Sequence, residues 1–328
     1  MSLEDYFNNS AVQLENHIVK VDDLFLGQVW DIEGFGDYLI LLDDHQERYF
    51  SLIDLNRNRL IKRFGTKGRG PQEMMEPVGI GIHHSNNTFQ MLLRNPERFV
   101  EYSIDSLLQQ NTANYLEVVK FNFKEESLYN ISPLYDGKRY VGTGLFHRGK
   151  YGITNEMGVL DTVVGSIHIP DDQRNIDYYQ LGMVYQGITK SHPGESKFVH
   201  ASTSSDLIEI VDSKSFESKH FQSYFPKVTI HNGMVGETPD SRIGFIALKV
   251  TSKYIYALFS GRTVMDQGGM AFSSNRLYVF NWVLMPVASY VLDEDVNCFF
   301  VTEDDRTIYS TTDINDEMQL VKWNMQHK

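Results

Sequence analysis

Four arginines spread along the chain could bind an acidic ligand: Arg69, Arg94, Arg148 and Arg262. A guanidinium group can grip a carboxylate or a sulfate through two parallel hydrogen bonds. On an acidic protein, however, each arginine can equally pair with a neighbouring Asp or Glu. Glu73 has two interpretations as well, because it could serve as a base or accept N–H groups of its own glycine-rich turn. These residues indicate binding chemistry more than a defined reaction.

His147 and Tyr185 complete the predicted set of ligand-binding residues. Tyr185 belongs to a tyrosine-rich stretch whose rings could stack on sugars, with packing against the fold as the alternative. The glycine- and methionine-containing segment 261–274 could be a lid over such a site, or simply a disordered tip. The chain contains no His-Glu-x-x-His, P-loop, Gly-x-Ser-x-Gly or EF-hand motif. We therefore assign no catalytic residue and no metal site, and we expect no cofactor.

Composition excludes several functional classes. The 328 residues carry a formal net charge of −13, which disfavours binding to nucleic acid. Cys298 is the single cysteine and lies in an apolar run, so a disulfide or a thiolate metal site within the chain is excluded. We expect it to be buried in a strand.

There is no run of 18 apolar residues that could span a membrane, and the polar start has no secretory signal. A lipid anchor lost with a trimmed signal peptide remains an open alternative.

The elements that would position these residues are short strands in a repeating pattern. Groups of four strands recur, and the second strand of each group is expected to begin near Leu39, Phe89, Tyr140, Val199, Ile255 and Phe299. The intervals are about 44 to 59 residues, close to the length of one propeller blade with loop insertions. The sixth group is one strand short, and a strand near residues 18–21 could fill the gap.

This pattern predicts an all-β fold, a six-bladed β-propeller of four-stranded antiparallel blades in which an N-terminal strand closes the last blade. Residues 15–328 would form one domain, preceded by a flexible segment over residues 1–14. Two stacked β-sandwiches are the alternative fold, but they do not explain the four-strand interval. In a propeller, the turns between second and third strands lie on the same face as the crossings between blades. That face would gather the arginines at the mouth of a central channel.

Two stretches carry a family resemblance. Residues 64–80 read Phe-Gly-x-x-Gly-x-Gly-Pro-x-Glu-x-x-x-Pro-Val-Gly-Ile, and residues 275–282 read Asn-Arg-Leu-Tyr-Val-Phe-Asn-Trp. The first resembles the linker between blades of NHL-type and TolB-like six-bladed propellers. The second, with residues 286–287 and 290–293, is similar to a hairpin of bacterial propellers often made as lipoproteins. The family has Asp-Gly after the Trp where this chain has Val283-Leu284, so the hairpin turn differs. The resemblance implies a propeller in the periplasm or anchored at the outer membrane.

Two functions remain open. The first is a non-catalytic, monomeric propeller that binds a glycan, a peptide or a partner protein at the mouth of the channel. It is favoured by the absence of catalytic motifs and by the resemblance. The second is a metal-dependent propeller enzyme, a lactonase, lyase or glycan-processing hydrolase, with Ca²⁺ held at the central channel. Ligands such as Glu73, Asn95, Asp206 and Asp304 would come from different blades, so their spacing is uninformative.

Overall fold

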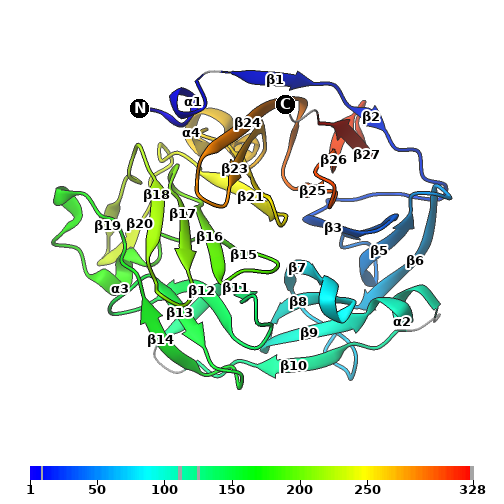
Figure 1. The fold of residues 1–328 in the computed structure, drawn as a ribbon, viewed down its shortest axis with the longest axis horizontal. Helices are drawn as coiled ribbons and strands as arrows, with labels where there is room; N and C mark the ends of the chain where they lie inside the picture. Colours follow the sequence, from blue (N-terminus) through cyan, green and yellow to red (C-terminus); the bar gives the residue numbers. More distant parts are fainter. Residues whose placement is uncertain (9, 110–112, 124–125, 326–328) are drawn as a thin grey trace. The chain divides into compact units, whose positions relative to one another are not determined.

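The computed structural model describes residues 1–8, 10–109, 113–123 and 126–325. It is built mainly of β-strands, which form six sheets and one small hairpin (Figure 1). Contacts divide the chain into two compact units. The first unit contains Met1–Leu14 and Asn122–Asn297, and the second contains Glu15–Phe121 and Cys298–Lys328. No helix in the described part of the chain is long and apolar enough to cross a membrane.

The first unit holds blades 3, 4 and 5, each an antiparallel meander of four strands. Blade 3 consists of β11 (Ser127–Pro133), β12 (Tyr140–Leu145), β13 (Tyr151–Thr154) and β14 (Leu160–Val164). Blade 4 consists of β15 (Gly187–Ser191), β16 (Lys197–Ser202), β17 (Ile208–Asp212) and β18 (Ser218–Phe221). Blade 5 consists of β21 (Phe245–Val250), β22 (Tyr254–Phe259), β23 (Ser274–Asn281) and β24 (Pro286–Val296). The hairpin β19 (Thr229–His231) and β20 (Met234–Gly236) lies between blades 4 and 5 in sequence.

The second unit holds blades 1, 2 and 6, built in the same way. Blade 1 consists of β3 (Asp31–Phe35), β4 (Tyr38–Leu42), β5 (Arg48–Asp54) and β6 (Arg59–Thr66). Blade 2 consists of β7 (Pro77–His83), β8 (Thr88–Arg94), β9 (Glu97–Ser103) and β10 (Leu116–Lys120). Blade 6 consists of β25 (Phe300–Val301), β26 (Thr307–Ile314), β27 (Glu317–Asn324) and the N-terminal β2 (His17–Ile18). The predicted six-bladed propeller, closed by an N-terminal strand, is confirmed.

The helices are short; the first precedes all strands of the chain, and the others lie between strands. They are α1 (Leu3–Tyr6), α2 (Ile104–Gln109), α3 (Tyr178–Leu181) and α4 (Val264–Gln267), with the 3-10 turns η1 (His84–Asn86), η2 (Asp171–Gln173) and η3 (Gly268–Phe272). Segment 261–274, expected to be a lid or a disordered tip, contains α4 and η3. One strand assignment was wrong. Phe299 does not begin a second strand, because the adjacent β25 is the first strand of blade 6 and β26 is the second.

Neighbouring blades within each unit pack through apolar faces. In the second unit, one cluster joins blades 1 and 2 around Phe50 and Phe89. Another joins blades 1 and 6 and includes Cys298, which is buried as expected but lies between β24 and β25 rather than in a strand. In the first unit, Tyr151 of blade 3 packs against Phe198 of blade 4. Because the middle strands are covered on both faces, they consist of almost continuous buried residues, as in β4 and β22.

In the crossing between blades 1 and 2, Glu73 accepts an N–H group of its own glycine-rich turn, which is one of the two roles that the sequence allows for it. Glu73 Oε2 accepts the Gly70 N–H at 2.7 Å. Gly68 has φ +143°, and a Cβ there would lie 2.0 Å from the same carboxylate oxygen, so the turn requires glycine. Lys67 pairs with Asp44 at 2.7 Å. This pair shows that the turn between the second and third strands shares a face with the crossing, as antiparallel alternation predicts.

The N-terminal residues are integrated into the first unit. Ser2 caps α1 in a capping box with Asp5, and β1 (Ala11–Leu14) pairs in parallel with β24, as the blue and orange strands in Figure 1 show. Leu3 and Phe7 are 3% and 4% exposed within the core of blades 4 and 5. A parallel fifth strand was not expected. The flexibility predicted for residues 1–14 stays a prediction, but the segment has defined contacts.

The Phe7 contacts predict that this segment stabilises the first unit. The Phe7 ring lies 5.0 Å from the rings of both Tyr278 and Phe280. Phe7→Ala is expected to lower the free energy of unfolding by about 3–4 kcal/mol, because it leaves a cavity in a packed core. The matched control is Phe25→Ala, whose ring is 76% exposed and should cost less than about 0.5 kcal/mol. Urea denaturation measures both values, and equal effects would contradict the buried position of Phe7.

Candidate functional site

Three of the predicted ligand-binding residues lie in the second unit. Arg69 donates from Nε to the Met75 sulfur at 3.3 Å, and Glu73 is held by its own turn. Arg94 is exposed at the end of β8. Within the described part of the chain, these three side chains form no hydrogen bond or ion pair with one another. Their role in ligand binding stays a prediction.

Three more of these residues lie near α3 or in the loop after β12, in the first unit. The His147 ring stacks on Tyr179 with centroids 5.0 Å apart, and the neighbouring Arg148 is exposed. Tyr185 is buried and donates its hydroxyl to Gln173 at 2.7 Å, while burial raises the pKa of Tyr185. This environment fits the packing alternative for Tyr185. Ligand binding by these three residues stays a prediction.

Arg262, the remaining predicted residue, anchors the loop between β22 and β23. Its guanidinium binds Asp295 through two bonds, at 2.6 and 2.9 Å. The same group donates to the carbonyl oxygens of Met270 and Ser273, both at 3.2 Å. Arg262 therefore fixes the short helices α4 and η3 against blade 5. It also lines a pocket on the predicted face.

This pocket has a volume of about 350 Å³ and lies entirely in the first unit. Its walls come from the turn between β16 and β17, the crossing between blades 4 and 5, the ends of β22 and β23, and α1. These are the turns and crossings that the sequence places on one face. The charged lining residues are Glu4, Asp206, Arg242, Arg262 and Arg276. A pocket of this size can hold a small ligand or part of a larger one.

The acidic groups in the pocket already have partners. Asp206, which is buried, accepts the backbone N–H groups of Ser223 at 2.9 Å and Tyr224 at 3.2 Å. Glu4 of α1 pairs with Arg276 of β23. Arg242 is different. Its guanidinium lies over the Tyr224 ring, 5.5 Å from the centroid, and it has no carboxylate partner among the residues that the structure describes.

A second group of charged residues is buried between blades 3 and 4. Glu209 of β17 and Lys150, each 3% exposed, form an ion pair of 2.9 Å, and the Tyr151 hydroxyl donates to the same carboxylate oxygen at 2.5 Å. Burial alone would raise the pKa of Glu209, but nearby His168, together with Lys150 and Tyr151, outweighs it and holds this pKa far below its usual range. The carboxylate is therefore ionised inside the fold.

Sequence reasoning missed the contributions of Glu4, Arg276 and Glu209. The first two meet only because α1 folds back onto blade 5, and no local pattern encodes that contact. Glu209 did leave a signal, since it interrupts the apolar run Leu207-Ile-Glu-Ile-Val211. A charge inside a strand that is buried on both faces needs a partner. The alternative expectation of Ca²⁺ at a central channel stays a prediction.

Comparisons with known proteins identify the family. The family described as TolB-like, 6-blade propeller-like, matches residues 7–304, and the chain belongs to it. A protein from Bacteroides fragilis whose description proposes that it is exported has a similar structure, with a TM-score of 0.59 and 10% identity over 96% of each chain. A member of the DUF4221 family from Bacteroides vulgatus is also similar, with a TM-score of 0.59 and 9% identity, over 97% of this chain and 98% of the other. No curated protein matches the sequence.

The buried ion pair predicts a specific pattern in a double-mutant cycle. Glu209→Gln is expected to lower the free energy of unfolding by about 3–5 kcal/mol, because it leaves the Lys150 ammonium buried and unpaired. Adding Lys150→Met should recover most of this loss. The exposed pair Lys138–Glu156, at 3.3 Å, is the matched control, and the corresponding changes there should cost less than about 1 kcal/mol. The idea fails if the double variant is as unstable as Glu209→Gln.

The depressed pKa of Glu209 also predicts how stability depends on pH. A carboxylate whose pKa is lower in the folded protein stabilises it fully above the pKa of the unfolded chain, and loses this contribution as pH falls through the folded-state pKa. The free energy of unfolding should therefore decrease progressively below about pH 5. This slope should be shallower in the Lys150→Met/Glu209→Gln double variant, as measured by urea titrations at pH 3–7. An unchanged slope would show that Glu209 is not the group responsible.

Proposed function

We propose that this protein is a non-catalytic binding protein of the bacterial cell envelope, which holds an acidic group of a glycan or peptide ligand in the pocket beside α1. The single observation that carries this proposal is Arg242. It lines the pocket and stacks on Tyr224, and none of the described carboxylates pairs with it. A ligand carboxylate would supply the missing counter-charge.

The surroundings of Arg242 favour a ligand with both an acidic and a flat apolar part. The Tyr224 ring lies beneath the guanidinium and holds it in place. Arg262 and Arg276 lie in the same wall, each paired with a carboxylate, Asp295 and Glu4 respectively. Asp206 accepts hydrogen bonds from its own side of the pocket and forms no ion pair with Arg242 among the described residues. A uronic-acid sugar or an acidic peptide has this combination of groups.

Two observations support the envelope location: the chain belongs to the TolB-like propeller family, and its fold is similar to that of a Bacteroides fragilis protein whose description proposes that it is exported. Binding at a face where turns of several blades gather is also a common use of such scaffolds, because loops on a rigid framework can vary without loss of the fold.

Calorimetric titration with two ligand series tests the proposal. One series contains oligosaccharides with and without uronic acids, and the other contains peptides with and without Asp and Glu. We expect saturable binding of an acidic member and none of its neutral counterpart. Arg242→Gln should weaken that binding about tenfold to a hundredfold, the value of one charge-assisted hydrogen bond.

The matched control is Arg174→Gln, which removes an exposed arginine elsewhere in the same unit. It should leave the affinity unchanged, and both variants should unfold at the wild-type temperature. If neither series binds, or if Arg242→Gln binds as tightly as Arg174→Gln, the pocket is not the ligand site.

A further inference from the structure

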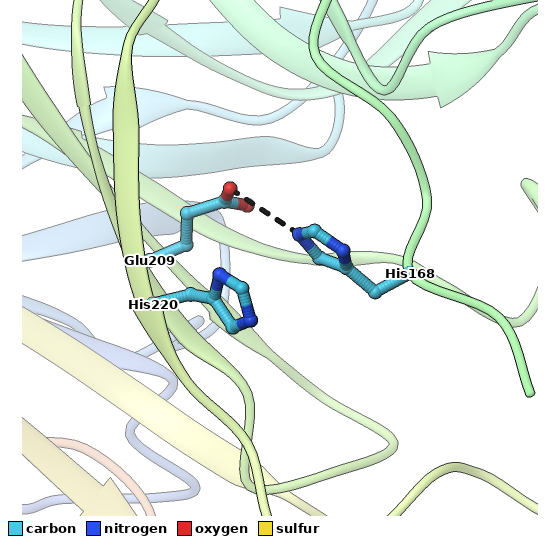
Figure 2. Close-up of side chains that lie close together, drawn as sticks. All are labelled: His168, Glu209 and His220. Carbon is cyan, nitrogen blue, oxygen red and sulfur yellow. Dashed lines mark ion pairs between the residues drawn. The ribbon is translucent and has the colours of Figure 1, made fainter.

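Two histidines lie beside the buried carboxylate of Glu209 (Figure 2). His220 is on β18, directly opposite Glu209 of β17 in the antiparallel register. His168 comes from the segment that follows β14 of blade 3. The strand pairing thus fixes two of these residues side by side, and the chain leaving blade 3 brings the third. We call them the His168–Glu209–His220 cluster.

The geometry of the cluster leaves one carboxylate oxygen available. Lys150 and Tyr151 both bind Oε2 of Glu209, at 2.9 and 2.5 Å. Oε1 faces His168, with 3.7 Å to Nε2, which is too long for a good hydrogen bond. The two imidazole rings stack with centroids 4.2 Å apart. One ligand atom from each of the three residues lies within 4.8 Å of the other two.

We propose that the His168–Glu209–His220 cluster binds one Zn²⁺ ion, with Oε1 of Glu209 and one ring nitrogen of each histidine as ligands. Two imidazole nitrogens and one carboxylate oxygen form a donor set that zinc commonly accepts, with its fourth position left to water. The ion would connect the segment after blade 3 to the two outer strands of blade 4.

The distances require only a modest adjustment. Tetrahedral zinc with ligands at about 2.0–2.1 Å places ligand atoms about 3.3 Å apart, so the widest pair must close by about 1.5 Å. Glu209 is fixed by burial, but His168 lies outside regular secondary structure and His220 is exposed on the outermost strand of its blade. The two histidine side chains can therefore move toward a stationary carboxylate.

The surroundings prepare these groups as ligands. Lys150 and Tyr151 orient the carboxylate through Oε2, in the way that outer partners commonly orient metal ligands. His220 is held opposite Glu209 by the strand register, so its ring lies beside the carboxylate. The Lys150 ammonium opposes a second cation, but its charge is paired with Glu209.

Zinc titration of the full-length, tag-free protein after chelator treatment tests this inference. Calorimetry and metal analysis after gel filtration should give one Zn²⁺ per chain, and zinc should raise the unfolding temperature reversibly. His168→Gln and His220→Gln should each weaken zinc binding at least tenfold. Both histidines have solvent access, so both variants should unfold near the wild-type temperature in the absence of zinc.

The matched control is His231→Gln, an exposed histidine on β19 that should leave zinc binding unchanged. Failure to retain one zinc per chain overturns the inference, as does wild-type affinity in either cluster variant. The zinc cluster and the pocket beside α1 share no residues. Loss of zinc binding in His220→Gln therefore tests only the zinc site, and loss of ligand binding in Arg242→Gln tests only the pocket.

Discussion

The main physical constraint in this molecule is burial on both faces of the middle strands of each blade. A sheet packed between two neighbours has no solvent-facing side, so β4 and β22 are apolar along almost their entire length. β16 is buried along almost its entire length as well, although it contains the polar residues His200 and Ser202. Any charge in such a strand must find its partner inside the fold, since an isolated buried charge is far too costly. Glu209 meets this condition through Lys150 and Tyr151, which reach it from the adjacent blade. The ion pair and the hydrogen bond thus add polar contacts to the apolar packing between blades 3 and 4.

A second constraint is that the free edge of a strand exposes unpaired N–H and C=O groups. The N-terminal residues cover two such edges, because β1 pairs with β24, the last strand of the blade 5 meander, and β2 completes blade 6 by pairing with its third strand, β27. The same residues place α1 over the turns of blades 4 and 5, where Glu4 meets Arg276 and the backbone helps to enclose the pocket. One short stretch of chain therefore contains both the strands that cover the two edges and the helix that lines the candidate ligand pocket.

The turns on the predicted face differ in how firmly they are held, and this difference matters for binding. Arg262 is bound on several sides and organises the β22–β23 loop, so its main role is structural in this conformation. Arg242 lies over the Tyr224 ring and lines the pocket. Two arginines that look equivalent in the sequence thus have different surroundings. The similar Bacteroides structures share the fold of this chain, and a shared fold does not by itself imply a shared ligand.

The sequence by itself determined the class of fold, because strand composition, turn residues and the recurring four-strand interval are local properties that survive without knowledge of contacts. It also predicted that an N-terminal strand completes blade 6 and that Cys298 is buried, and it gave binding to its own glycine turn as one of two roles for Glu73. It could not place Phe299 on the correct strand, since short strands near a turn have no distinct pattern. Only the tertiary structure shows that Glu4 pairs with Arg276 and that His168 lies beside Glu209 and His220. It also shows that Arg242 contacts the Tyr224 ring and has no carboxylate partner among the described residues. Each of these contacts involves residues from different blades or residues that are far apart in the chain. They come together through packing of the fold, and no spacing in the sequence indicates it.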